Sequence, residues 1–184
     1  MEGKMNALLK TAAEPDAMEY VEDFDIPQIK DDEVLMEIKA VGICGTDHSL
    51  YRWNPAIANS YHIQYPAIFG HEFSGVIAEV GKNAPANLKV GQRVTANPVL
   101  FDNTCEYCDR GEVNICDNRP FYGTDLPGAF AKYMAIREQT KSARADYNCG
   151  FTDLRIYTLY SVHCYAERLE QSALALLVCS WLPC

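Results

Sequence analysis

The sequence lacks the features that carry a protein into or across a membrane. Its first ten residues hold no apolar stretch of signal-peptide length, because Leu8 and Leu9 are followed at once by Lys10. The apolar run over residues 172–182 is shorter than the roughly 20 residues that a helix needs to span a bilayer. We therefore expect a cytoplasmic location and no membrane partner.

Positive charge is also scarce. The 184 residues include 16 Lys and Arg against 25 Asp and Glu, which gives a net charge of −9. This excess lies in residues 1–138, because residues 139–184 carry equal numbers of each sign. Binding to nucleic-acid phosphates requires clustered positive charge. The composition therefore argues against a nucleic-acid partner.

Glycine is missing where a nucleotide-binding turn would need it. No glycine follows Gly150, and the pattern Gly-x-Gly-x-x-Gly occurs nowhere in the chain. Dinucleotide-binding domains use that turn to bring backbone amides to the pyrophosphate, so we expect no such domain here. Residues 139–184 also change in composition and hold four of the eight cysteines. We interpret them as an aberrant, frameshifted end to a truncated gene. The alternative is a genuine short extension with a helix over Leu169–Leu177.

The remaining length is enough for one domain with its own core, so a metal is not needed to supply one. Val34, Met36 and Ile38 alternate with Leu35, Glu37 and Lys39 and predict a strand over residues 33–43. Further strands are predicted over 5–10, 18–23, 73–80, 90–96 and 128–136, and a short helix over 46–51 capped by Thr46 or Asp47. Many short strands with long loops predict a mainly β domain, either a barrel or a sandwich.

One motif combines three kinds of metal ligand. His71 and Glu72 stand side by side among ordered glycines in residues 70–81, and Cys44 lies upstream in Gly-Ile-Cys-Gly-Thr-Asp. A catalytic zinc uses an incomplete set of sulfur, nitrogen and oxygen ligands, because one position must stay open. Alone, Cys44 or His71 would suit an ordinary buried side chain, so the prediction depends on their combination. Without an export signal, we expect the cysteines to be thiols or metal ligands and not disulfides.

These motifs resemble the zinc-dependent medium-chain alcohol and polyol dehydrogenases, especially the sorbitol, threonine and galactitol-phosphate dehydrogenase branch. The resemblance extends over residues 5–137, and the order of the glycines around His71 and Glu72 carries much of it. It implies a GroES-like, partly open β-barrel with short helices over residues 1–138 and a zinc lobe inserted at 102–119. It also implies oxidation of a secondary alcohol with NAD(P), for which this chain has no Rossmann domain.

By this resemblance, Cys44 and His71 are ligands of a catalytic zinc. Glu72 is a third ligand or a nearby carboxylate that exchanges with water. The family's fourth ligand is a Glu or Cys further along the chain, and no residue here matches it.

The resemblance also implies a proton relay. Thr46 matches the hydroxyl that takes the alcohol proton, but the relay histidine would stand at Ser49, and the chain has His48 one residue earlier. That shift turns a helical side chain by about 100°, so His48 is a candidate whose role stays open. Asp47 either caps the helix or supports a metal ligand, and the sequence favours neither.

A second ligand group consists of Asp102, Cys105, Cys108 and Cys116. Its spacing matches the family's structural-zinc lobe, except that Asp102 stands where the pattern has its first cysteine. A carboxylate is a legitimate zinc ligand. The lobe therefore holds zinc through one aspartate and three thiolates, or it has lost its metal. We favour the metal, because three thiolates at the right spacing would be an unusual remnant.

We therefore predict a zinc-dependent alcohol or polyol dehydrogenase domain, which in this truncated chain is weakly active or inactive. The alternative is a non-catalytic zinc-binding module with the same barrel. A zinc-free quinone reductase relative would conflict with Cys44, His71 and the cysteine lobe together. The expected partner is a small alcohol or polyol, and the sequence leaves a homo-oligomer open.

Overall fold

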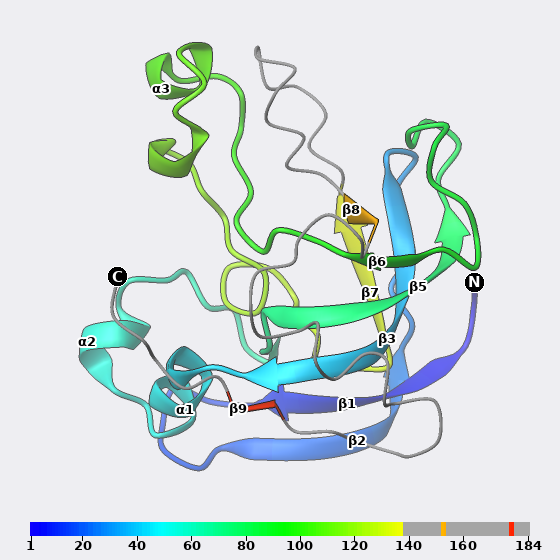
Figure 1. Cartoon of the computed structure of the whole chain (residues 1–184). Helices are drawn as coiled ribbons and strands as arrows, with labels where there is room; N and C mark the ends of the chain where they lie inside the picture. Colours follow the sequence, from blue (N-terminus) through cyan, green and yellow to red (C-terminus); the bar gives the residue numbers. More distant parts are fainter. Residues whose placement is uncertain (138–151, 154–176, 179–184) are drawn as a thin grey trace.

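The computed structural model describes residues 1–137, 152–153 and 177–178. These residues form two β-sheets and a few short helices (Figure 1). The smaller sheet has the order β2-β1-β4, with β1 at Lys4–Lys10, β2 at Met18–Asp25 and β4 at Ala67–Ile68. The larger sheet has the order β7-β3-β5-β6-β8, and β9 pairs with β3. Its strands are β3 at Glu33–Ile43, β5 at Glu72–Val80, β6 at Arg93–Thr95, β7 at Tyr133–Arg137, β8 at Thr152–Asp153 and β9 at Leu177–Val178.

Strand β3 runs through the centre of the larger sheet. It pairs antiparallel with β5, from Val34 opposite Val80 to Gly42 opposite Glu72, and its first half pairs with β7 on the other side. Leu35, like Val34, has no exposed surface, so both faces of β3 are covered at that end. The register with β5 brings the end of β3 next to the start of β5.

The segment over residues 128–132 joins the two sheets. The N–H of Leu8 donates to the carbonyl of Phe130 at 2.8 Å, and the N–H of Lys132 donates to Asn6 at 3.0 Å. The carbonyl of Lys132 in turn accepts from the N–H of Ile38 in β3 at 2.9 Å. In the described part of the chain, β2 and β8 are edge strands. The barrel is therefore partly open, and the predicted mainly β fold is confirmed.

Apolar side chains pack in several clusters, and one of them, with Met5, Leu9 and Ile68 of the smaller sheet and Leu35 of β3, lies between the two sheets. Each of these large residues contributes roughly 1.5–3 kcal/mol when fully buried, so the barrel has a core that does not depend on a metal. The largest cluster contains Val34, Met36, Phe73, Ile77, Leu88, Val94, Leu100, Tyr122, Ala129, Met134 and Ile136.

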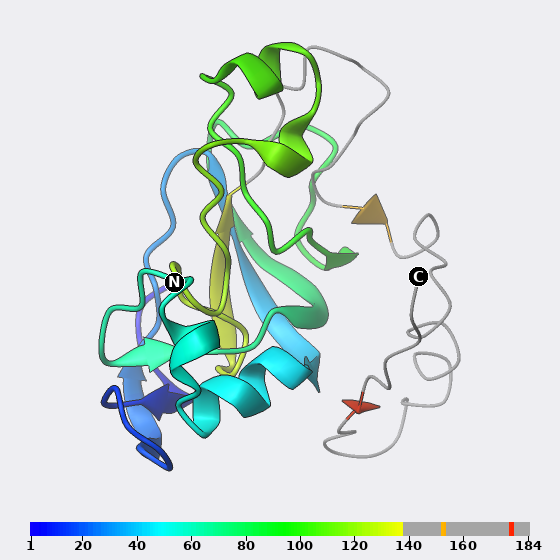
Figure 2. The same ribbon diagram turned by 90° about the vertical axis from the view of Figure 1, so that its left-hand side faces the viewer.

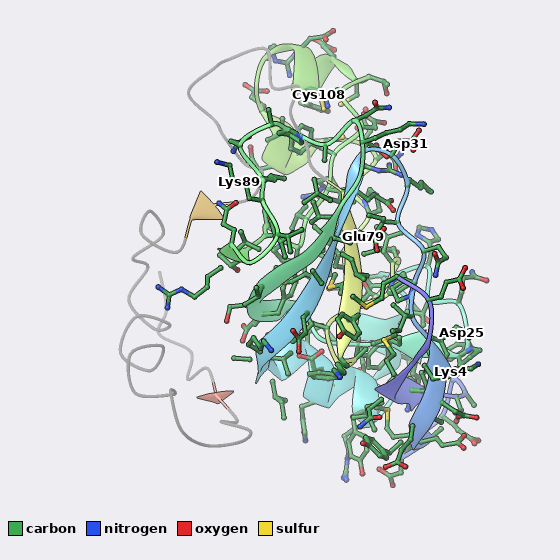
Figure 3. The ribbon with its side chains drawn as sticks, turned by 90° about the vertical axis from the view of Figure 1, so that its right-hand side faces the viewer. Lys4, Asp25, Asp31, Glu79, Lys89 and Cys108 are labelled. Atoms are coloured by element: carbon green, nitrogen blue, oxygen red, sulfur yellow. The ribbon has the colours of Figure 1, made fainter. Side chains whose placement is uncertain are left out.

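The short helices lie at two places. Helices α1 (Gly45–Tyr51) and α2 (Pro55–Ala58) sit together beside the barrel (Figure 2). Helix α3 (Glu106–Asp109) and the 3₁₀ helix η1 (Val113–Ile115) form a lobe that stands away from both sheets. In Figure 3, Cys108 in this lobe lies at the opposite end of the molecule from the ion pair between Lys4 and Asp25, whose atoms are 2.8 Å apart.

Two predicted strands are shorter than expected. The strand predicted over 90–96 is limited to β6, because Gly91 turns the chain with φ +87° and leaves Val90 66% exposed. The strand predicted over 128–136 becomes β7 alone, since residues 128–132 form the junction between the sheets.

The start of helix α1 agrees with the prediction only in part. Its N-cap residue is Cys44, with φ −79° and ψ 160°, and not Thr46, while Asp47 contributes to the cap from the third helical position by accepting the N–H of Cys44. The helix predicted over 169–177 lies outside the described residues, except for Leu177 in β9. Among the helices that the structure describes, none is long and apolar enough to cross a membrane.

Candidate metal centres

The first centre forms where β3 and β5 bring two loops together. Cys44 directly follows β3, Glu72 begins β5, and His71 precedes it. Candidate ligand atoms of these three residues all lie within 4.8 Å of one another. Zinc binds sulfur at about 2.3 Å and nitrogen or oxygen at about 2.0–2.2 Å. The three side chains could therefore hold one metal ion with small movements.

Asp47 lies behind this centre and connects its two loops. Its side chain is buried, with Oδ2 accepting a hydrogen bond from the N–H of Cys44 at 2.8 Å and Oδ1 accepting one from Gly70 at 3.2 Å. Burial raises the pKa of Asp47, and the nearby His71 opposes that rise. The residue is thus more than a helix-starting residue, because one carboxylate fixes the backbone beside both Cys44 and His71.

The imidazole of His71 directs Nδ1 towards Asp47, which leaves Nε2 as the candidate metal ligand. Its Nδ1 is buried without a hydrogen-bond partner among the described residues and lies 3.6 Å from Oδ1 of Asp47. Metal-binding histidines commonly direct one ring nitrogen to a carboxylate and offer the other to the ion. A shift of a few tenths of an ångström would complete the Asp47 contact. The donor set and this unpaired atom fit a bound zinc.

Two glycines keep the space around the centre open. A Cβ atom on Gly42 would lie 2.5 Å from Oε2 of Glu72, directly across the β3–β5 pair. Gly70, which precedes His71, has φ +93°, and a Cβ there would lie 2.7 Å from the ring of Phe130. A side chain at position 42 would therefore displace Glu72, whereas one at position 70 would clash with Phe130 and strain the backbone just before His71.

Thr46 and His48, the two predicted relay residues, differ in their position relative to the centre. Oγ1 of Thr46 lies 3.9 Å from Sγ of Cys44, beside the centre. His48 is exposed on α1 and lies outside the group of three ligands. Ser49 donates from Oγ to the carbonyl of Gly45 at 2.9 Å, within its own helix. The structure thus brings Thr46 to the centre but does not bring His48 there.

Two aromatic residues that the sequence analysis did not single out also lie here. The ring centroids of His71 and Phe121 are 5.0 Å apart, and those of Tyr61 and Phe121 are 6.1 Å apart. Burial raises the pKa of Tyr61. Asp125 holds the Phe121 backbone by accepting its N–H at 3.0 Å. Both rings stand in irregular loops, and no spacing in the sequence connects them with His71.

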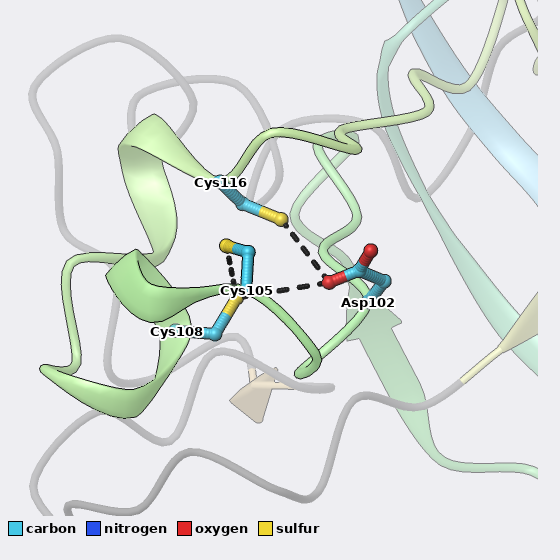
Figure 4. Close-up of side chains that lie close together, drawn as sticks. All are labelled: Asp102, Cys105, Cys108 and Cys116. Atoms are coloured by element: carbon cyan, nitrogen blue, oxygen red, sulfur yellow. Dashed lines mark hydrogen bonds between the residues drawn. The ribbon is translucent and has the colours of Figure 1, made fainter.

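The second centre is the lobe around α3 and η1 (Figure 4). Ligand atoms of Asp102, Cys105, Cys108 and Cys116 all lie within 4.8 Å of one another. The sulfurs of Cys105 and Cys108 are 3.6 Å apart, and Oδ1 of Asp102 lies 3.5 Å from Sγ of Cys116 and 4.0 Å from Sγ of Cys108. Tetrahedral zinc with ordinary bond lengths separates its ligands by about 3.6–3.8 Å. These distances fit one zinc ion.

Local hydrogen bonds orient the side chains of the lobe ligands without a metal ion. Oδ1 of Asp102 accepts from the N–H of Thr104 at 2.9 Å, which lowers the pKa of this carboxyl. The thiol of Cys116 donates to the carbonyl of Asn118 at 3.2 Å, and burial raises its pKa to about 11. A backbone hydrogen bond from Asp117 lowers the pKa of Cys105. The aspartate therefore points into the thiol cluster, where the family pattern has a cysteine.

Together, these features define a partly open β-barrel domain with two groups of sulfur, nitrogen and oxygen donors that could each hold a metal ion. The chain belongs to the alcohol dehydrogenase GroES-like domain family, whose family profile matches residues 30–144. The family predicted from the sequence motifs is thus confirmed.

Known proteins of this kind are similar over the same region. L-threonine 3-dehydrogenase of Symbiobacterium thermophilum is 38% identical over 135 residues, which cover 73% of this chain and 37% of the relative. Galactitol-1-phosphate dehydrogenase from Escherichia coli matches in structure with a TM-score of 0.62 and 32% identity, over 72% of this chain and 36% of that one.

A structure of a short chain alcohol dehydrogenase from Escherichia coli CFT073, complexed with NADH, also matches with a TM-score of 0.62 and 32% identity. It covers 73% of this chain and 36% of the other. The chain therefore spans well under half the length of the relatives that it matches.

Proposed function

We propose that the chain is the zinc-binding domain of an alcohol or polyol dehydrogenase that uses NAD(P). The observation that carries this proposal is the convergence of a thiol, an imidazole and a carboxylate in a chain of this family, from Cys44, His71 and Glu72. Zinc bound there supplies Lewis-acid activation of a secondary alcohol. The similarity to threonine and polyol-phosphate dehydrogenases supports a small hydroxylated substrate.

The protein's own residues have separate tasks in this proposal. Cys44 and His71 bind the ion, and Asp47 holds them in position through the N–H groups of Cys44 and Gly70 and through the imidazole of His71. Glu72 completes the set of three, which leaves a position for the substrate. Thr46, 3.9 Å from Cys44, takes up the alcohol proton. The exposed His48 on the same helix is the candidate to exchange that proton with solvent.

We propose a structural zinc in the second centre. Asp102, Cys105, Cys108 and Cys116 supply four protein ligands, so no position is left for a substrate. This site stabilises the lobe and does not take part in the reaction.

A second function is favoured by one observation. These 184 residues contain no Gly-x-Gly-x-x-Gly turn for a dinucleotide. Tested alone, the chain should therefore bind zinc but oxidise alcohols slowly or not at all. The second candidate function is therefore that of a non-catalytic zinc-binding module.

Elemental analysis combined with an activity assay tests these proposals. The purified chain should contain two zinc ions, and the Cys44→Ser and Cys105→Ala variants should each contain one. Reduction of NAD(P) is then measured with a panel of polyols and amino alcohols. A zinc content near zero, or a Cys44→Ser variant that keeps both ions, contradicts the metal assignment. Rapid reduction of NAD(P) by the wild-type chain contradicts the proposal of a non-catalytic module.

A further inference from the structure

We propose that Cys105 and Cys108 form an oxidant-sensitive dithiol site. A hydroperoxide would join them in a disulfide, release the metal ion of the lobe and leave Cys116 as a free thiol beside Asp102. The release of metal rests on the structural zinc proposed above. The choice of sulfur pair rests only on the residues of the lobe.

The geometry favours this pair. The two sulfurs are 3.6 Å apart, and Cys105 caps the helix α3 that contains Cys108. A disulfide has an S–S bond of about 2.05 Å, so the sulfurs must approach by roughly 1.5 Å. Side-chain rotation within one helical turn can supply a movement of this size. The loop that the bond closes is very short, so little entropy opposes its formation.

Exposure decides which sulfur reacts first. Cys105 is partly exposed at the surface of a lobe that stands away from the barrel, whereas Cys108 and Cys116 are each only 3% exposed. A small peroxide therefore reaches Cys105 before the other two. Cys108 is then the neighbour in position to react with the oxidised sulfur.

Asp102 determines which thiol of the lobe stays outside the disulfide. Sγ of Cys116 lies within 4.8 Å of the other two sulfurs, and it also has oxygen neighbours, the carbonyl of Asn118 at 3.2 Å and Oδ1 of Asp102 at 3.5 Å. A carboxylate does not form a disulfide, so the three thiols of the lobe give one disulfide and one thiol. A lobe with a fourth cysteine at position 102 could form two disulfides.

The reaction balances with peroxide as the oxidant. The thiolate of Cys105 attacks one oxygen of hydrogen peroxide and breaks the O–O bond, which gives a sulfenic acid and hydroxide; the proton released when the thiolate formed converts the hydroxide to the first water. The thiol of Cys108 then attacks the sulfenic sulfur, the S–S bond forms, and a second water leaves. Two electrons pass from the sulfurs to the peroxide. Asp102 and Cys116 remain as two ligands, too few for a structural zinc.

Peptide mapping of the full chain tests the pairing directly. Trypsin cuts after Arg93 and Arg110, so the peptide over residues 94–110 contains both Cys105 and Cys108. Cys116 lies in the next peptide, which runs to Lys132 because Arg119 is followed by proline. After treatment with hydrogen peroxide, the first peptide should lose the mass of two hydrogens, and Cys116 should still react with iodoacetamide. Zinc release is followed with a coloured chelator in the Cys44→Ser chain, and it should match the disulfide one for one.

Two variants make the test sharper. Asp102→Cys should gain a second disulfide that links the two tryptic peptides, with the loss of four hydrogens in total. Cys116→Ser should still lose two hydrogens in the peptide over 94–110, whether or not it holds zinc.

The possible failures are distinguishable. If the wild-type lobe contained no zinc but still formed the disulfide, this result would contradict the proposed structural zinc and support the pairing. Peroxide that links the two peptides in the wild-type chain, or that oxidises Cys116 while the peptide over 94–110 keeps both thiols, would overturn the pairing. An Asp102→Cys chain that forms only one disulfide would overturn the role given to Asp102.

Discussion

The two proposed metal centres are assembled in opposite ways. The lobe ligands come from one short stretch of chain, residues 102–116, around α3 and η1, with a small buried cluster of Phe101, Cys108 and Cys116. The barrel centre joins Cys44 to the loop of His71 through the β3–β5 ladder and Asp47. The lobe has little core of its own, so we expect the proposed metal to stabilise its fold. In the barrel, the fold stabilises the site.

Removing a lobe ligand should have the largest effect. In Cys108→Ala, the lobe should lose its zinc and its ordered structure, because structural zinc contributes about 10–16 kcal/mol in isolated finger peptides. Zinc content should fall by one ion per chain, and amides over 102–116 should lose protection from hydrogen exchange. The thermal unfolding of the barrel should change little. The control is Glu106→Ala, an exposed position in the same helix, which should keep both ions.

If Cys108→Ala instead lowered the unfolding temperature of the barrel and the lobe together in one transition, the contrast between the centres would be wrong. The lobe would then be a structural part of the barrel.

Asp47→Asn should have the next largest effect and should act on the barrel centre alone. An amide cannot accept both backbone N–H groups that now bond to the carboxylate, nor does it support His71 as a charged partner. Loss of such a supporting carboxylate typically lowers metal affinity about 10–100-fold. Zinc affinity is measured by competition with a chelator, and the lobe ion should be unaffected. Asp109→Asn, exposed in the lobe, is the matched control, and an equal loss in both variants would contradict the role of Asp47.

The same contrast explains how far the sequence could be interpreted. The lobe was predictable as a group, because its ligands recur at short intervals within one segment. For the barrel centre, the glycine order around His71 identified the family and the three candidate ligands. The sequence could not show that Asp47 contacts both loops, or that Phe121 packs on His71, because the sheet register and the junction at residues 128–132 create those contacts. The strands over 90–96 and 128–136 were overestimated for the same reason: a local pattern does not show where the chain must turn to join another sheet.

Gly42→Ala should test the fold's control over the barrel centre. The added Cβ would lie 2.5 Å from Oε2 and 3.1 Å from Cβ of Glu72. Overpacking of this kind costs about 1–3 kcal/mol, and zinc affinity at the barrel centre should fall as Glu72 moves. Urea unfolding and chelator competition measure the two effects. Combining Gly42→Ala with Glu72→Ala should cost less than the sum of the single changes, and simple additivity would show that Glu72 is not the group displaced.

The smallest effect at neutral pH should come from Tyr122→Phe, which alters the barrel and neither centre. The hydroxyl of Tyr122 accepts a hydrogen bond from the N–H of Arg137 at 2.9 Å, and its loss should cost about 1 kcal/mol. Burial raises the pKa of Tyr122 to about 12, above its value of about 10 in the unfolded chain. The unfolded state therefore releases this proton first, and stability falls as the pH rises from about 10 towards 12, by on the order of 2–3 kcal/mol. Urea unfolding across that range should show a shallower decline in the variant than in the wild type. Equal declines in both proteins would place the alkaline sensitivity elsewhere, for example in the thiols of the lobe, and would make the lobe the pH-sensitive region.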